Sequence, residues 1–174
     1  MPASSDAGPL IWLGRCDALH PLKKLHQEIV IPEAVYTEAA TRGHEKGHMD
    51  AETTKKATEE GWIRVCKPEK RFIDKVEDRE KRLGIELGRG EREAIALALE
   101  RGITLFLTND EDAHQTGKSL GLDPKGVLYV LLKAVKEEHI TDKRAKEILS
   151  RMLEDGFWLS PRIIHVFHEA LDRL

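Results

Sequence analysis

The chain has 174 residues, of which 28 are lysine or arginine and 31 are aspartate or glutamate, so its net charge is −3. This near balance excludes a histone-like or tail-type nucleic-acid binder, because such proteins attract phosphates through a broad basic field. Any contact with nucleic acid must therefore come from a local patch. With 40% hydrophobic residues, the chain suits one ordinary domain with a sizeable core.

Cysteine usage and hydropathy bear on the compartment. Cys16 and Cys66 are too few for a disulfide scaffold, which favours a reducing cytoplasm. The most apolar stretch, residues 126–135, is far shorter than the roughly 20 residues that a membrane span needs. The N-terminus also lacks the basic region and long apolar run of a secretory signal. We therefore expect a soluble cytoplasmic protein with no membrane partner.

Short β-branched or aromatic runs alternate with longer helical patterns along most of the chain. A short strand is expected to end near Asp6, and others at residues 29–31, 62–65 and 103–108. Helices are expected after Pro21, from Pro32, and over residues 50–60, 68–82 and 91–100. The segment 91–100 is apolar almost all round, which predicts the central buried helix. This alternation is typical of an α/β domain whose parallel strands are joined by crossover helices.

The last third of the sequence is mostly helical in pattern. Helices are predicted over residues 110–120, 126–138, 141–156 and 160–171, with a turn at Asp123-Pro124. No repeat, low-complexity tract or linker interrupts the chain. We therefore expect one domain that ends in a helical extension.

Two short motifs resemble catalytic signatures. Residues 44–48 match the His-Glu-x-x-His zinc pattern, but glycines bracket the motif and charged residues surround it, which favours a solvated helix start. Residues 116–119 imitate the end of a phosphate-binding loop, yet Asp112 stands where that loop needs its first glycine and would repel phosphates. Neither zinc chemistry nor nucleotide hydrolysis is therefore expected.

Four carboxylates occupy positions that a solvated surface explains poorly. Asp6 stands at the end of the first expected strand, and Asp110 follows the strand at 103–108. Glu38 shares a helix face with apolar neighbours, and Glu91 lies one turn before the most apolar part of its helix. Open α/β sheets bind ligands beyond the carboxyl ends of their strands, where two of these acids are expected.

Clustered carboxylates in a cleft repel one another unless a proton or a cation compensates them. A set of oxygen ligands without cysteine or paired histidine favours Mg²⁺ or Mn²⁺ over zinc. Such an ion supplies an activated water and stabilises charge on an attacked phosphate. The four acids therefore indicate phosphodiester hydrolysis.

Each acid also has a purely structural interpretation, which the sequence leaves open. Asp6 suits a turn before Gly8-Pro9, and Glu38 suits an exposed helix position. Glu91 complements a helix dipole, and Asp110 suits an N-cap. Taken singly, each of these interpretations is at least as good as a catalytic one.

The segments that contain these acids resemble the PIN domain, a nuclease fold of prokaryotic toxin–antitoxin pairs and RNA-processing enzymes. The matching residues are 5–11, 29–38, 90–98 and 107–110, in family order, together with a Gly-Trp-Ile segment at 61–63. Their spacing is similar in particular to a PIN-like subgroup catalogued as a domain of unknown function. The resemblance implies a three-layer α/β/α fold with a central, mainly parallel sheet and a C-terminal helical extension. It places a PIN-like nuclease domain at residues 1–156 and a helix packed on the same domain at residues 157–174.

The resemblance also implies a function. Asp6, Glu38, Glu91 and Asp110 correspond to the family's acids, which hold Mg²⁺ or Mn²⁺ and cut single-stranded RNA. The sequence departs from the family pattern in two places. Its first strand is poorly apolar, and residue 91 is a glutamate where many members have aspartate. Glu93 and Asp112 are alternative residues that would share the role of Glu91. A toxin of this kind has a cognate antitoxin protein as its partner.

Two further expectations remain. The poorly apolar first strand and the modest charge also fit an alternative function. In this alternative the protein is a catalytically weak PIN-like module with a nucleic-acid-binding or regulatory role. The apolar residues of the C-terminal helices exceed what a small extension easily buries, which predicts a homodimer through part of that extension. The competing interpretation is that the last helices only cover the sheet.

Overall fold

The computed structural model describes residues 1–45 and 50–174, without the side chains of residues 41–50. The His-Glu-x-x-His pattern at 44–48 lies outside the described side chains. In chain order the elements are β1 (Ala3–Ser5), α1 (Ala7–Arg15), α2 (Leu19–His26), β2 (Ile29–Pro32), α3 (Glu33–Glu45), α4 (Asp50–Glu59), β3 (Ile63–Cys66), α5 (Lys70–Leu83), α6 (Arg89–Arg101), β4 (Leu105–Leu107), α7 (Glu111–Ser119), β5 (Asp123–Lys125), α8 (Val127–Lys136), α9 (Asp142–Glu154) and α10 (Pro161–Leu171).

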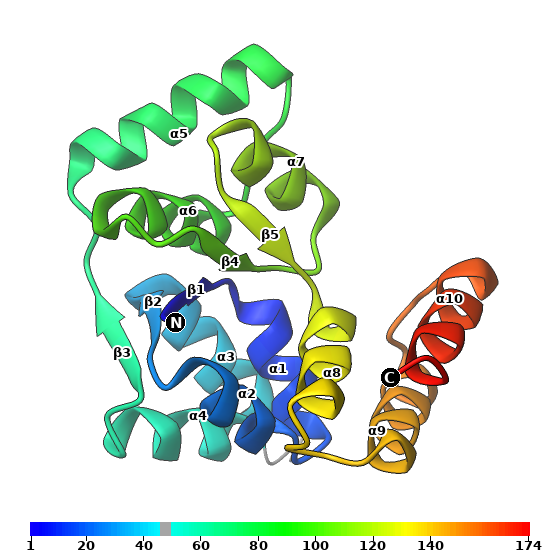
Figure 1. Cartoon of the computed structure of the whole chain (residues 1–174). Helices are drawn as coiled ribbons and strands as arrows, with labels where there is room; N and C mark the ends of the chain where they lie inside the picture. The colour runs from blue at the N-terminus through cyan, green and yellow to red at the C-terminus, as the bar shows by residue number, and fades with distance from the viewer. Residues whose placement is uncertain (46–49) are drawn as a thin grey trace.

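The five strands form one sheet in the order β3-β2-β1-β4-β5, and every neighbouring pair is parallel. In Figure 1, α5, α6 and α7 lie on one side of this sheet, and α1 to α4 with α8 lie on the other. The structure thus confirms the α/β class, the parallel sheet and the helical layers predicted from the sequence.

The first strand lies at the centre of the sheet although it contains two serines. Ser4 pairs with Val30 on one side and with Phe106 on the other, and both serines are fully buried. The Ser4 hydroxyl donates to the carbonyl of Ala94 at 2.8 Å, and the Ser5 hydroxyl donates to the carbonyl of Asp6 at 2.8 Å. Since their polar groups are satisfied, the strand is buried without being apolar.

Helix α6 forms the centre of the core. Its residues Ala94 to Ala98 are all fully buried, as expected for a helix that is apolar all round. Gly102 ends it in the left-handed conformation, with φ of 63°, where glycine carries no steric penalty.

Two elements differ from the sequence prediction. The segment around Pro124 is an edge strand, β5, and not a turn; Pro124 pairs with Phe106. An edge strand tolerates proline because one of its sides has no ladder to complete. Helix α1 was not predicted, because Gly8-Pro9 resembles a turn; Asp6 caps this helix and Pro9 lies in its first turn, where proline is well tolerated.

The C-terminal helices α9 and α10 lie beside α8, on the side of the molecule away from the sheet (Figure 1). The chain end contributes Phe167 and Leu171 to the core, whereas Trp158, Ile163 and Val166 are exposed. In the described part of the chain, no helix is long and apolar enough to cross a membrane.

Candidate functional site

The strand order places a crevice between β1 and β4. From β1 the chain proceeds through β2 to β3 on one side of the sheet, and only later to β4 and β5 on the other. Ligands of open parallel sheets bind at such a reversal, beyond the carboxyl ends of the strands. Asp6 directly follows β1, and Asp110 comes shortly after β4. Two of the four predicted acids therefore flank this crevice.

Asp6 is a buried carboxylate with two fixed hydrogen bonds. Its side chain accepts from the backbone N–H of Gly8 at 3.1 Å and from the hydroxyl of Thr108. Burial raises the pKa of Asp6 from 3.8 to about 7; the Thr108 and Gly8 hydrogen bonds oppose this rise, while the charges of Glu91 and Asp110 add to it. Asp6 therefore exchanges its proton near neutral pH.

Thr108 connects the two acids of the crevice. Its hydroxyl donates to Asp6, and the same oxygen accepts from the backbone N–H of Asp110 at 3.0 Å. Asp110 in turn caps α7, because its Oδ1 accepts from the backbone N–H of Ala113 at 2.8 Å. The loop after β4 thus holds Asp110 at a set distance from Asp6.

Glu91 and Glu38 complete the acidic group from the neighbouring helices. Glu91 Oε2 accepts from the backbone N–H of Gly88 at 2.7 Å. Burial raises the pKa of Glu91, the Gly88 hydrogen bond opposes this, and the charges of Asp110, Glu38 and Asp112 raise the pKa further. Each of these acids is therefore close enough to repel Glu91.

A glycine allows the start of α6 to approach α3. A Cβ at Gly90 would lie 3.2 Å from Val35 Cγ2 and 3.7 Å from Glu38 Oε2. A side chain at this position would require Val35 to shift by a few tenths of an ångström. Gly90 therefore keeps Glu91 and Glu38 within reach of the same site.

The structural roles that the sequence left open are also present. Asp6 and Asp110 cap α1 and α7, and Glu91 accepts from the N-cap residue of α6. Helix N-termini carry a partial positive charge, which favours carboxylates. The caps and the shared site are compatible, because the three helices begin around the same crevice.

The arginines next to Glu91 are engaged with other acids. Arg92 donates two hydrogen bonds to Glu80, at 2.6 and 2.9 Å, and Arg89 pairs with Glu93 at 2.7 Å. Glu93 therefore neutralises Arg89. Asp112, in contrast, lies close enough to Glu91 for its charge to raise the pKa of Glu91.

The acids fit a hard divalent cation by chemistry. They supply only oxygen ligands. Burial is the main cause of the raised pKa of Asp6 and Glu91, and a cation would relieve both the burial of charge and the smaller repulsion between the acids. As the side chains stand, no three His, Cys, Asp or Glu residues among residues 1–40 and 51–174 are grouped so as to hold a metal ion.

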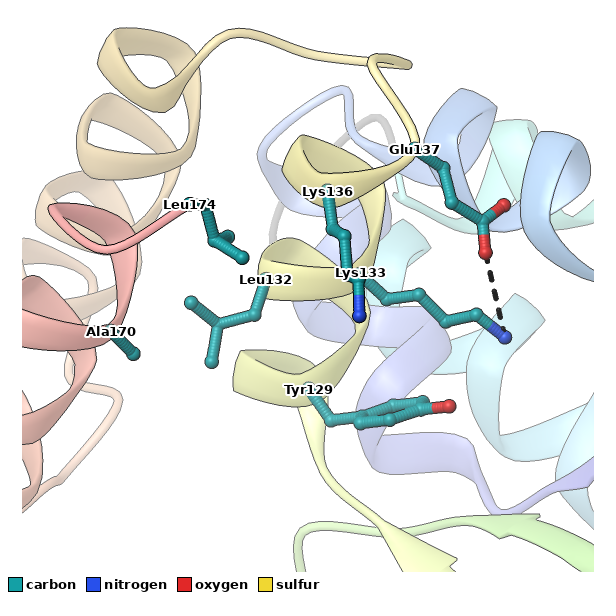
Figure 2. A pocket seen from close by; sticks show the side chains of 7 residues that line it. All are labelled: Tyr129, Leu132, Lys133, Lys136, Glu137, Ala170 and Leu174. Carbon is teal, nitrogen blue, oxygen red and sulfur yellow. Dashed lines mark ion pairs between the residues drawn. The ribbon is translucent and has the colours of Figure 1, made fainter.

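Among the cavities beside the C-terminal helices, two are lined in part by α8. One, between α8 and α10, has a single acid, Glu137, whose carboxylate lies 3.9 Å from the Lys133 ammonium (Figure 2). Leu132 and Leu174 face each other across it (Figure 2). The other is lined by Asp110 and therefore adjoins the acidic group.

The comparison with protein families matches residues 3–173 to a family described as a PIN domain. The chain therefore belongs to the PIN-domain family. PIN domains are generally nucleases and usually use divalent metals, which agrees with the acidic group at the carboxyl edge of this sheet. The comparison with curated proteins found no match.

Within this PIN domain, sequence reasoning identified the acids but missed the residue that connects them. Thr108 lies in the segment 107–110 that resembles the family, and the structure shows that it is buried and bridges Asp6 and Asp110. One sequence feature indicated this role: Thr108 is a hydroxyl residue that directly follows a buried strand and stands two residues before an acid.

Proposed function

We propose that this PIN domain is a divalent-metal-dependent endoribonuclease that cuts single-stranded RNA. One observation carries the proposal: at the switch point of a parallel sheet, the charges of Glu91 and Asp110 act on the buried Asp6, and those of Asp110 and Glu38 act on Glu91. Such repulsion is costly to keep in a fold unless a cation relieves it.

In this proposal the four carboxylates hold Mg²⁺ or Mn²⁺. The ion would supply an activated water and stabilise the charge of the attacked phosphate. Asp6 loses its proton on binding, because its pKa of about 7 keeps it largely neutral below that pH. Thr108 orients Asp6 and the loop of Asp110 by its two hydrogen bonds.

The test is cleavage of single-stranded RNA in the presence of Mn²⁺. We expect the wild type to cleave and the Asp110→Asn variant to be at least about a hundredfold slower, since a ligand charge is lost while the helix cap is kept. Asp74→Asn, which removes a half-exposed acid paired with Lys70 on α5, serves as a matched control. Equal cleavage by wild type and Asp110→Asn rejects the assignment.

The alternative is a catalytically weak PIN-like module that binds nucleic acid or regulates. The pairing of Arg89 and Arg92 with glutamates favours it, because neither arginine is held ready for a phosphate. Calorimetric titration with Mn²⁺ separates the two functions. Clear binding that Asp6→Ala abolishes excludes the alternative, and the lack of binding supports it.

A role as the toxin of a toxin–antitoxin pair extends the nuclease proposal. Its support is the nuclease character of the family, since unrestricted cleavage of cellular RNA would arrest growth unless a partner neutralised the enzyme. Induced expression should arrest bacterial growth for the wild type and leave growth unaffected for Asp110→Asn. Arrest by both proteins speaks against a ribonuclease toxin.

A further inference from the structure

The cavity beside Asp110 joins the acidic site to the C-terminal extension. It has a volume of about 280 Å³, near the lower end of the roughly 300–1,000 Å³ typical of small-ligand sites. Its lining combines polar groups after β4 with aromatic residues of α8 and of the segment before α10: Thr108, Asn109, Asp110, His114, Tyr129 and Trp158. A ligand in this cavity therefore lies next to Asp110.

Trp158 is the most exposed large apolar side chain among the described residues, at 81%. Its neighbours Phe157 and Leu159 pack against the core. Phe157 stacks at a tilt on Trp12 with ring centroids 5.1 Å apart, and its N–H donates to the Met152 carbonyl at 2.8 Å. The chain on both sides of Trp158 is thus anchored, while the indole stays in solvent.

The wall of the cavity at α8 is also held in place. Asn109 Oδ1 accepts from the backbone N–H of Val127 at 2.9 Å. A Cβ at Gly126 would lie only 2.9 Å from this oxygen, so the contact requires glycine. Cavity and acidic site therefore share one rigid loop, residues 108–110.

Positive charge accompanies the aromatic wall. The ammonium groups of Lys125 and Lys133 lie 5.5 and 5.8 Å from the centre of the Tyr129 ring. Each also pairs with one acid, Asp123 at 2.8 Å and Glu137 at 3.9 Å, so a phosphate would compete with a carboxylate for these lysines. Aromatic faces next to lysines are the features by which proteins bind single-stranded nucleic acid: bases stack on the rings and phosphates meet the cations.

We propose that this cavity is a nucleobase subsite in which a base next to the cleaved phosphate stacks on Trp158. The proposal rests on the proposed function, because it takes single-stranded RNA as the substrate. The subsite explains why an anchored segment keeps an indole in solvent beside the acids. It also assigns to the C-terminal extension a part in substrate binding.

The test is a binding measurement in EDTA, so that binding is separated from cleavage. A short fluorescently labelled single-stranded RNA is titrated with wild type, Trp158→Ala, Trp158→Phe and the control Val166→Ala, whose exposed side chain lies on α10 outside the cavity. We expect Trp158→Ala to weaken binding roughly 5- to 100-fold, the range for one stacked base. Trp158→Phe should retain most of the affinity, and Val166→Ala should bind as the wild type does.

A strand of the same length without bases distinguishes stacking from attraction to the backbone. Trp158→Ala should leave the affinity for this abasic strand unchanged, whereas Lys125→Ala should weaken the binding of both strands. An equal loss on both strands for Trp158→Ala overturns the stacking role.

The outcomes separate this proposal from the nuclease proposal. Equal affinity of wild type and Trp158→Ala for the RNA overturns the subsite, even when the wild type cleaves. Weakened binding by Trp158→Ala supports the subsite, even when the wild type does not cleave. A wild type that neither binds nor cleaves overturns both proposals. A loss of affinity accompanied by a halved mass in sedimentation assigns Trp158 to a contact between two copies and overturns the subsite.

Discussion

Asp6 illustrates how a single residue is tuned by its surroundings. The whole residue is only 4% exposed, and Glu91 and Asp110 add negative charge nearby. Two hydrogen bonds, from Gly8 and Thr108, still favour the charged form. The balance leaves the pKa at about 7, so both proton and metal binding are sensitive to pH near neutrality.

The raised pKa of Asp6 predicts a pH-dependent stability. The folded state holds this proton up to about pH 7, whereas the unfolded state loses it near 3.8. Between these values the folded state binds more protons, so the contribution of Asp6 to stability falls as the pH rises and is constant above about 7. Asp6→Asn should remove this fall, and the variant should gain on the order of a few kcal/mol over the wild type between pH 4 and pH 8.

Urea denaturation in EDTA at several pH values measures this difference. Addition of Mn²⁺ at pH 8 should favour the wild type, because the ion binds the charged carboxylate. Parallel pH profiles for the two proteins would contradict the assigned pKa.

Thr108 provides a second prediction at the residue scale. Thr108→Val keeps the shape of the side chain but removes the hydroxyl that joins Asp6 and Asp110. Affinity for Mn²⁺ should fall roughly 10- to 100-fold, the usual effect of losing a group that orients a metal ligand. Thr108→Ser, which restores the hydroxyl, should recover most of the affinity in calorimetry. An unchanged affinity of Thr108→Val would show that the bridge does not prepare the site.

Among the elements, helices α5 and α6 are joined by a buried ion pair. Glu80 is 4% exposed and accepts from Arg92 and from the backbone N–H of Leu87 at 2.7 Å. Burial alone would raise the pKa of Glu80, but the Arg92 and Leu87 hydrogen bonds lower it below its usual value. Since Leu87 and Arg92 flank the start of α6, this pair positions the turn that carries Glu91.

Removal of Glu80 should therefore destabilise the fold. Glu80→Ala leaves the Leu87 N–H without this partner and leaves Arg92 with the Leu87 carbonyl at 3.1 Å and Glu77 at 4.0 Å. We expect a loss of about 3 kcal/mol in the free energy of unfolding. Asp74→Asn, which breaks the exposed Lys70–Asp74 pair on the same helix, should cost at most about 0.5 kcal/mol. Similar losses for both variants, measured by urea denaturation, would argue against a buried role for Glu80.

The whole molecule presents an apolar surface on its C-terminal extension. Val166 and Leu174 are 53% and 58% exposed, and Leu174 lines the cavity between α8 and α10 (Figure 2). The homodimer expected from the sequence would cover such a surface, and a two-fold dimer is the commonest closed assembly.

Sedimentation at micromolar concentration tests the dimer. We expect a mass twice that of the 19.7 kDa chain, which Val166→Glu should reduce to the monomer while the circular dichroism spectrum is retained. The charged side chain would have to be buried in the interface, which is unfavourable. A monomeric wild type contradicts the prediction. In that case α10 only covers the core of its own chain.

The sequence by itself determined the fold class, and it predicted the four acids as a candidate site. Alternating apolar segments indicated parallel strands and crossover helices, since this periodicity is local and survives without tertiary contacts. It missed α1 and β5, because Gly8-Pro9 and Pro124 have the composition of turns and only their place in the assembled sheet decides otherwise.

Only the tertiary structure decided how the acids act on one another. The pKa of Asp6 depends on Glu91 and Asp110, and Asp6 also accepts from Thr108, which is 102 residues away in the chain. The pairing of Arg92 with Glu80 likewise joins two different helices. The same holds for the cavity that unites Asp110 with Trp158. Burial, charge repulsion and shared hydrogen bonds depend on distances through space, and these arise only when the strand order brings β1 and β4 together.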